Sequence, residues 1–342
     1  MKVVKTIHAA GHVLCHDLTQ IIPGEYKGAR FRKGHIVTEE DIPVLLSMGK
    51  EHLYVWEKPE GFLHEDEGAE RLAALCENEH MTRGETREGK IELFANCDGL
   101  FKVRTDALRR VNGLGELMVA SRHGNTPVHQ GDKLLGTRII PLIIDGAKLD
   151  AAERAAGGEP LTALLPYRKK KAGIVITGTE VEKGLIEDKF TPVVRGKLAE
   201  FGAEVIGEIM VGDDPARGTA AILQLIEAGA EIVVCTGGMS VDPDDKTPLA
   251  IKNTGAEIVT YGAPVLPGAM FLLAYYGEHR IPVCGLPGCV MYSKRTIFDL
   301  VLPRLMADDP VTADELAALG EGGLCLNCPT CTYPNCGFGK GR

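Results

Sequence analysis

The sequence predicts an α/β protein whose main domain is a mostly parallel sheet covered by helices on both faces, giving three layers. Three apolar runs, at residues 173–177, 232–235 and 281–284, are typical of buried strands, and each ends in a glycine-marked loop. Helix-like segments separate the runs, so the strands should be parallel, because parallel neighbours need a long crossover connection. Ligands bind beyond the carboxyl ends of such strands, and we expect the three loops to converge.

Length and charge limit the class of protein. A chain of 342 residues suits two or three domains better than one core. The formal net charge of -9 argues against a nucleic-acid-binding protein, which usually has a basic face. No apolar run approaches the roughly 20 residues of a membrane span, and the start of the chain lacks a secretory signal core. We expect a cytoplasmic protein that binds neither nucleic acid nor membranes.

Five segments follow one another along the chain. Residues 1–60 carry short β-like runs between glycine turns, with one capped helix, and predict a small β-rich module. Residues 61–150 predict an α+β accessory region, and residues 151–171 a partly helical linker. The α/β domain is expected at residues 172–306, and a short Cys-rich tail at residues 307–342.

Within these segments, apolar spacing predicts individual elements. In the accessory region we expect a helix at residues 103–111 and a β-branched strand at residues 134–144. In the α/β domain and the tail, the expected helices are residues 192–201, 215–228, 291–306 and 314–319, and the further strands are residues 204–210 and 257–261.

The loop after the second run carries the strongest signal for a site. Gly237 and Gly238 let the backbone approach a ligand and turn its N–H groups toward an anion. Asp242, Asp244 and Asp245 follow and supply the oxygen ligands that Mg²⁺ prefers. A phosphate with a metal ion is therefore the first expectation, although glycine and aspartate also dominate ordinary turns.

Carboxylates also follow the other strands: Glu180 and Asp188 after the first, and Asp213 and Asp214 after residues 204–210. Acidic side chains that converge repel one another unless a cation lies between them, so convergence would imply Mg²⁺. The alternative is that several of them cap helices; Asp214 precedes Pro215, which suits an N-cap. Capping and ligand contact can coexist.

The α/β domain carries several motifs in order, at residues 177–181, 184–188, 211–214, 236–241, 245–248 and 285–288. Because of these motifs, residues 172–305 resemble the molybdopterin-binding domain shared by molybdopterin molybdotransferases (molybdenum insertases) and molybdopterin adenylyltransferases. Residues 31–49 and 128–144 are similar to the accessory regions of the insertases.

The resemblance implies an often homo-oligomeric protein of molybdenum cofactor biosynthesis that binds molybdopterin or adenylylated molybdopterin. With Mg²⁺ it would place molybdate on the dithiolene, for use by a molybdoenzyme. The catalytic residues implied are Glu180, Asp214 and Asp245, and the Mg²⁺ ligands are Asp242 and Asp245. The cofactor-binding residues implied are Gly178, Thr179, Asp188, Gly237, Gly238, Met239, Ser240, Thr247, Pro267, Gly268, Leu286, Pro287 and Gly288.

Two loops depart from the insertase pattern. Residues 285–290 carry Cys289 and Val290 where insertases usually have Asn-Pro, and residues 265–270 lack the lysines of a Lys-Pro-Gly-Lys-Pro-like loop. A non-catalytic molybdopterin carrier, or a redox-responsive sensor that uses the Cys-rich tail, therefore stands beside the molybdotransferase. An adenylyltransferase fits less well, because the long N-terminal region resembles the insertases.

The tail carries a second signal, Cys325-x2-Cys328-x2-Cys331-x4-Cys336. Four thiolates within a dozen residues can surround one ion, and in a reducing compartment such clustering indicates a metal rather than disulfides. The stepping resembles the ligation of a [4Fe–4S] cluster more than a zinc ribbon, but the last spacing departs from the ferredoxin pattern and zinc remains the alternative. A flexible tail without metal is the third possibility.

Overall fold

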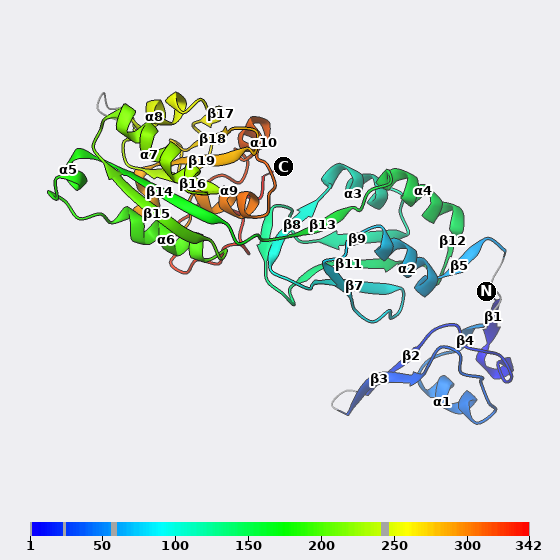
Figure 1. Ribbon diagram of the computed structural model, residues 1–342. Coiled ribbons are helices and arrows are strands. Elements are labelled where there is room, and N and C mark those ends of the chain that lie inside the picture. Colours follow the sequence, from blue (N-terminus) through cyan, green and yellow to red (C-terminus); the bar gives the residue numbers. More distant parts are fainter. Residues whose placement is uncertain (1, 23–24, 56–59, 241–245, 342) are drawn as a thin grey trace. The chain divides into compact units, whose positions relative to one another are not determined.

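The computed structural model describes residues 2–22, 25–55, 60–240 and 246–341. The chain divides into two compact units, and Figure 1 labels their helices and strands. Unit 1 comprises residues 1–97, 103–124 and 130–164, and unit 2 comprises residues 98–102, 125–129 and 165–342. Within the described ranges, no helix has both the length and the apolar character needed to cross a membrane.

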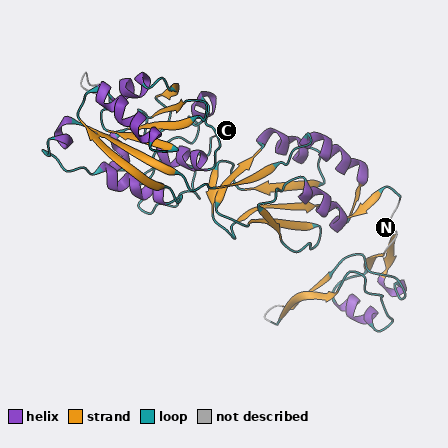
Figure 2. Ribbon diagram, viewed as in Figure 1, coloured by secondary structure: helices purple, strands orange, loops and turns teal. Residues whose placement is uncertain are grey.

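Unit 1 consists of short antiparallel sheets with helices packed on them (Figure 2). Its strands pair as β1 with β4, β2 with β3, β5 with β12, and β6-β7-β11-β9 in one four-stranded sheet. The elements are β1 (Lys2–Lys5), η1 (Thr6–His8), β2 (Leu18–Ile22), β3 (Tyr26–Phe31), α1 (Asp41–Ser47), β4 (His52–Val55), β5 (Phe62–His64), α2 (Glu65–Ala74), β6 (Met81–Arg83), β7 (Lys90–Ala95), α3 (Thr105–Asn112), β9 (Leu117–Ser121), β11 (Lys133–Ile139), β12 (Ile143–Asp145) and α4 (Gly146–Ala156).

Three elements of this part differ from the sequence expectation. The helix expected at residues 103–111 begins later, because strand β8 (Gly99–Val103) ends there and α3 follows. The strand expected at residues 134–144 is two strands, β11 and β12, separated around Pro141, whose ring nitrogen cannot donate to a ladder. Residues 151–171 contain the end of α4, strand β13 (Thr162–Pro166) and the start of β14.

The first residue of α2 gives unit 1 a pH dependence. Glu65 is 8% exposed, and burial, followed by the neighbouring charge of Asp66, raises its pKa from 4.5 to about 7. Between these two values the unfolded carboxyl ionises while the folded one holds its proton, so stability falls as the pH rises through this window. We expect Glu65→Gln to stabilise the protein by about 3 kcal/mol above pH 7 and to change little below about pH 4.5. Urea unfolding at both pH values checks this, and an equal gain at both would contradict it.

Unit 2 is built on a six-stranded sheet of order β15-β14-β16-β19-β18-β17. The first four strands are parallel, and β18 and β17 continue the sheet antiparallel, which confirms the mostly parallel α/β prediction. The elements are β8, β10 (Thr126–Val128), β14 (Lys171–Thr177), α5 (Thr179–Glu182), α6 (Phe190–Ala199), β15 (Glu204–Val211), α7 (Pro215–Glu227), β16 (Ile232–Thr236), α8 (Thr247–Asn253), β17 (Glu257–Tyr261), β18 (Leu272–Tyr276), β19 (Ile281–Leu286), η2 (Gly288–Met291), α9 (Ile297–Met306) and α10 (Ala313–Ala318).

Side-chain alternation along the strands builds one core on each face of this sheet. Ile174 and Val234 point into a cluster completed by α6 and α9. Val175 and Val233 point into a second cluster completed by α7 and α8. The helices therefore form the two outer layers, as predicted.

Helix boundaries in unit 2 follow the capping side chains. The helix expected from residue 192 begins at Phe190, because Asp188 Oδ1 accepts hydrogen bonds from the N–H groups of Phe190 and Thr191. The helix expected from residue 291 begins at Ile297, where Thr296 and Asp299 form a capping box. The apolar residues before it form η2 instead.

Candidate functional site

Three strand ends meet at one edge of the unit 2 sheet. Strands β14, β16 and β19 are adjacent and parallel, with Ile176 paired to Thr236 and Thr236 paired to Leu286 (Figure 1). The prediction that the three glycine loops converge is therefore confirmed. The loop between β17 and β18 lies at the same edge, since Leu272 pairs with Gly285 near the end of β19.

The first two loops are packed so closely that only glycine fits between them. Gly237 has φ +83°, and a Cβ built on it would lie 2.2 Å from the carbonyl oxygen of Thr177. Gly238 has φ +53°, and its Cβ would lie 2.8 Å from Thr247 Oγ1. Both positions thus require the conformational freedom and the small size of glycine.

A buried group of threonines holds these loops together. Thr177 Oγ1 donates to the carbonyl oxygen of Thr236 at 3.0 Å and lies 2.8 Å from Thr247 Oγ1. The Thr247 N–H donates to the carbonyl oxygen of Gly238 at 3.2 Å. Thr247, which the resemblance assigns to cofactor binding, is only 2% exposed, and here its side chain supports the loop from below.

The loops surround a cavity of about 800 Å³, which we call the strand-end cavity. Four carboxylates and one lysine line it, so an anion would need an accompanying cation there. The lining residues are Ile176, Thr177, Gly178, Glu180, Val181, Ile186, Glu187, Asp188, Lys189, Phe190, Asp213, Gly237, Gly238, Ser240, Met291 and Tyr292.

The carboxylates of this region also organise the backbone. Asp213 Oδ2 accepts a hydrogen bond from the Thr179 N–H at 2.9 Å, which ties the loop after β15 to the loop after β14. Asp188 caps α6, as described above, and still lines the cavity. Asp214 Oδ1 accepts from the N–H groups of Ala216 and Arg217, which makes it the N-cap of α7. Asp214 is not among the residues that line the cavity.

The N-cap contact predicts how Asp214 variants should behave. Asp214→Ala removes the acceptor for two N–H groups of α7 and should lower the free energy of unfolding by about 1 kcal/mol. Asp214→Asn keeps an acceptor oxygen and should unfold like the wild type. Urea unfolding of both variants tests this. If both lose the same stability, capping is not the main contribution of Asp214.

Several residues that the resemblance assigns to the cofactor point elsewhere. The Met239 side chain is buried in the core, where its sulfur would lie 2.6 Å from a Cβ built on Gly285. Leu286 and Pro287 are buried, and Gly288 opens η2. None of these four lines the strand-end cavity, and Asp242 and Asp245 lie outside the described residues.

The loop between β17 and β18 also departs from the expectation. Gly268 packs on the start of α9, where a Cβ would lie 2.4 Å from Ile297 Cγ2. The carbonyl oxygen of Pro267 accepts a hydrogen bond from the Ile297 N–H at 3.2 Å. Neither residue lines the strand-end cavity, so this loop supports α9.

Two residues of the third loop line the cavity without having been predicted. Met291 ends η2 and Tyr292 follows it, and Tyr292 is 81% exposed. The apolar pattern predicts a helix through both residues, and an exposed aromatic side chain on a helix indicates no site. The missed signal is the capping pair Thr296 and Asp299. Because of this pair the helix begins at Ile297, and Tyr292 lies in the loop before it.

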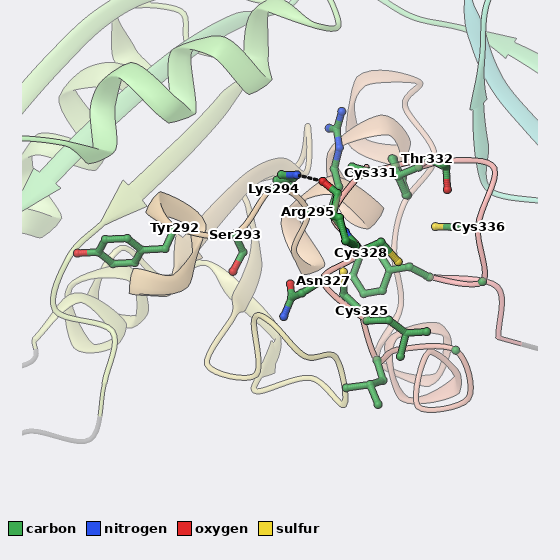
Figure 3. A pocket seen from close by; sticks show the side chains of 17 residues that line it. Tyr292, Ser293, Lys294, Arg295, Cys325, Asn327, Cys328, Cys331, Thr332 and Cys336 are labelled. Carbon is green, nitrogen blue, oxygen red and sulfur yellow. Dashed lines mark hydrogen bonds between the residues drawn. The ribbon is translucent and has the colours of Figure 1, made fainter.

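The four tail cysteines line a second cavity, of about 670 Å³, which we call the cysteine cavity (Figure 3). None of the ten cysteines forms a disulfide. Residues 292–295 also line this cavity, and Tyr292 lines both cavities. The structure therefore brings the predicted metal ligands together beside the loop that follows β19.

Comparison with known proteins gives two family matches in the chain. Residues 173–307 match the family described as "probable molybdopterin binding domain", and residues 3–57 match a domain of unknown function. The chain is 29% identical over 196 residues to a molybdopterin molybdenumtransferase of Synechococcus elongatus, covering 54% of this chain and 46% of that protein. It is 37% identical over 90 residues to a CinA-like protein of Mycobacterium tuberculosis, covering 26% and 21%.

Among solved structures, the tungsten cofactor synthesizing protein MoaB from Pyrococcus furiosus is 24% identical, with a TM-score of 0.32. That match covers 40% of this chain and 89% of the MoaB chain. The chain spans less than half the length of the curated relatives named above. The family match covers the sheet and all three strand-end loops. Residues 173–307 are therefore similar to the family described as "probable molybdopterin binding domain".

Proposed function

We propose that the strand-end cavity binds molybdopterin or adenylylated molybdopterin and that the protein is a molybdopterin molybdotransferase. The observation that carries this proposal is that Gly237, packed closely on Thr177, lines one cavity with Gly238, Glu180 and Asp213. Backbone N–H groups of such glycine loops commonly bind phosphate. The similarity to a molybdopterin molybdenumtransferase over 196 residues supports the same reaction.

Mg²⁺ fits the residues of the strand-end cavity. Oxygen donors from Glu180, Asp188 and Asp213 line the cavity, and their charges need a cation before phosphate or molybdate can enter. When bound, Mg²⁺ would neutralise the oxyanion charge and orient the phosphate. We include Asp242 and Asp245 as further ligands, with Asp245 and Glu180 as the catalytic carboxylates; Asp214, implied by the resemblance, caps α7 and does not line this cavity. Lys189 lines the same cavity and can pair with an anionic substrate.

Four further features belong to the proposed function. The protein acts in the cytoplasm and uses molybdate as co-substrate. A molybdoenzyme accepts the product, and a second copy of the chain is a partner. The proposal also includes a metal at Cys325, Cys328, Cys331 and Cys336, either a [4Fe–4S] cluster or zinc.

One observation favours a second function, that of a non-catalytic molybdopterin carrier or redox-responsive sensor. Residues 265–270, where the insertases have a lysine-bearing loop, are paired here with the tail. The Leu266 N–H donates to the carbonyl oxygen of Gly323, and the Cys325 N–H donates to that of Leu266, both at 2.8 Å. A loop that is hydrogen-bonded to the tail would respond to changes in the tail. It would not supply a positively charged side chain to the cofactor.

One reaction separates the two functions. The purified chain is incubated with adenylylated molybdopterin, Mg²⁺ and molybdate, and released AMP and incorporated molybdenum are measured. The molybdotransferase predicts AMP release that depends on molybdate and Mg²⁺, with matching molybdenum incorporation. Saturable binding without AMP release would assign the carrier, and no binding would contradict both functions.

A further inference from the structure

The tail around the cysteine cavity is packed onto the core of unit 2. Phe338 is 4% exposed, and the hydroxyl of Tyr333 donates to the backbone carbonyl of Asp299 at 2.9 Å. A Cβ built on Gly339 would lie 2.4 Å from Leu300, and one on Gly341 would lie 2.2 Å from the carbonyl oxygen of Glu321. These contacts fix both ends of the cysteine segment, so its four thiols are held around one space.

The cysteines occupy two levels of this space. Cys325 and Cys336 are half-buried and pack against the core that contains Phe298 and Phe338, whereas Cys328 and Cys331 are exposed. All four line the same cavity of about 670 Å³. Two of the four ligands are thus anchored by packing against the core, and two remain accessible to solvent.

The spacing of the sulfur atoms distinguishes between metals. A structural zinc binds four sulfurs at about 2.3 Å in a closed tetrahedron, which would place the sulfurs about 3.8 Å apart. No three of the four tail Sγ atoms, all of which the structure describes, lie within 4.8 Å of one another. No three of them are therefore close enough to hold one zinc ion in this structure. A [4Fe–4S] cluster takes one thiolate at each of four iron atoms and so accepts a wider spacing of the sulfurs.

Positive side chains face the same cavity. Lys294 Nζ donates to the carbonyl oxygen of Pro329 at 3.0 Å, which places the ammonium beside the loop between Cys328 and Cys331 (Figure 3). The Arg295 guanidinium lies over the Tyr333 ring, 5.1 Å from its centroid. Four thiolates around a cluster carry net negative charge, which Lys294 can offset in part, whereas Arg295 already pairs with Asp299 and Glu200.

We propose that Cys325, Cys328, Cys331 and Cys336 bind a [4Fe–4S] cluster in the cysteine cavity. The cluster lies next to the strand-end cavity, because Tyr292 lines both cavities. The site stands independently of molybdopterin, since its ligands and its positive side chains belong to the tail and to residues 294–295. Its test measures iron without any pterin present.

The test uses the full chain, purified without oxygen and reconstituted with ferrous iron and sulfide. We expect about four iron and four sulfide per chain, with a broad visible absorption that bleaches on reduction. The double variant Cys328→Ser/Cys331→Ser removes two exposed ligands that do not pack in the core, and its iron content should fall by at least about tenfold.

Cys97→Ser is the matched control, because Cys97 is half-buried and lies in unit 1, outside the cavity. It should retain the full iron content, and circular dichroism should show the same thermal transition for both variants without iron. One zinc per chain and no iron in the wild type would overturn the cluster, as would the absence of both metals. Unchanged iron in the double variant would overturn the assigned ligands.

Discussion

Gly237→Ala should abolish ligand binding at the strand-end cavity and lower the free energy of unfolding by at least about 3 kcal/mol. The new Cβ would lie 2.2 Å from the carbonyl oxygen of Thr177, a backbone atom that cannot rotate away. To relieve the contact, the β14 and β16 loops must separate, which breaks the threonine contacts beneath them. Isothermal titration with molybdopterin and Mg²⁺, together with urea unfolding, measures the two effects.

The control for this variant is Gly229→Ala. Gly229 follows α7 with φ +96°, so alanine is strained there too, but nothing lies within 4 Å of its Cβ. It should lose only about 1 kcal/mol and bind ligand like the wild type. The difference between the two variants isolates the contact with Thr177. If Gly237→Ala binds as tightly as Gly229→Ala, the loop does not form the cradle.

Asp299→Ala should destabilise unit 2 by about 3–5 kcal/mol, because it leaves a buried cation without its partner. Asp299 is 4% exposed, and its Oδ1 lies 2.6 Å from Lys197 Nζ and 2.8 Å from Arg295 Nη1. Its Oδ2 accepts from the Thr296 N–H at 2.7 Å and so caps α9. The substitution removes all three contacts at once. Urea unfolding followed by circular dichroism measures the loss.

Glu200→Ala is the surface counterpart of this variant. Glu200 also accepts from Arg295, at 3.0 Å, but its side chain is 46% exposed. Water screens that pair, so the loss should stay below about 1 kcal/mol. Equal losses in the two variants would show that burial of the Asp299 carboxylate contributes little. A larger loss of unfolding free energy in Asp299→Ala would show that the buried contacts at the first turn of α9 stabilise the helix more than the surface pair does.

The strand ends of the α/β domain could be predicted because their signal is local. Apolar runs such as residues 232–235 stop at a glycine pair, and a backbone that must pass within contact distance of Thr177 admits nothing larger. The first residues of helices were harder to predict from the sequence. The apolar pattern continues through residues 288–291, so only the capping pair Thr296 and Asp299 marks where α9 begins.

The direction of side chains at the site could not be predicted from motifs. Met239 stands in the glycine loop, yet its side chain fills the space that Gly285 leaves in the core. Pro267 and Gly268 turn toward α9 because Gly268 packs on Ile297. A motif identifies which residues lie near a site. Whether a residue contributes its backbone or its side chain depends on packing with strands that are distant in sequence.

The cysteine cavity depends on such distant contacts as well. The spacing of the cysteines predicts a metal, but the positions of Lys294, Arg295 and Tyr292 beside them follow from the packing of the tail on α9. That packing uses Gly339, which no metal-binding pattern includes. The sequence therefore predicted that the four cysteines cluster, and it missed that Tyr292 lines both their cavity and the strand-end cavity.

A crystal structure of the chain grown with molybdopterin and Mg²⁺ tests the central claim most directly. We predict ligand density in the strand-end cavity, with the phosphate against the backbone N–H groups that follow Thr236 and the metal beside Glu180, Asp188 or Asp213. Molybdopterin bound on another face of unit 2, with the strand-end cavity holding only solvent, would contradict the account.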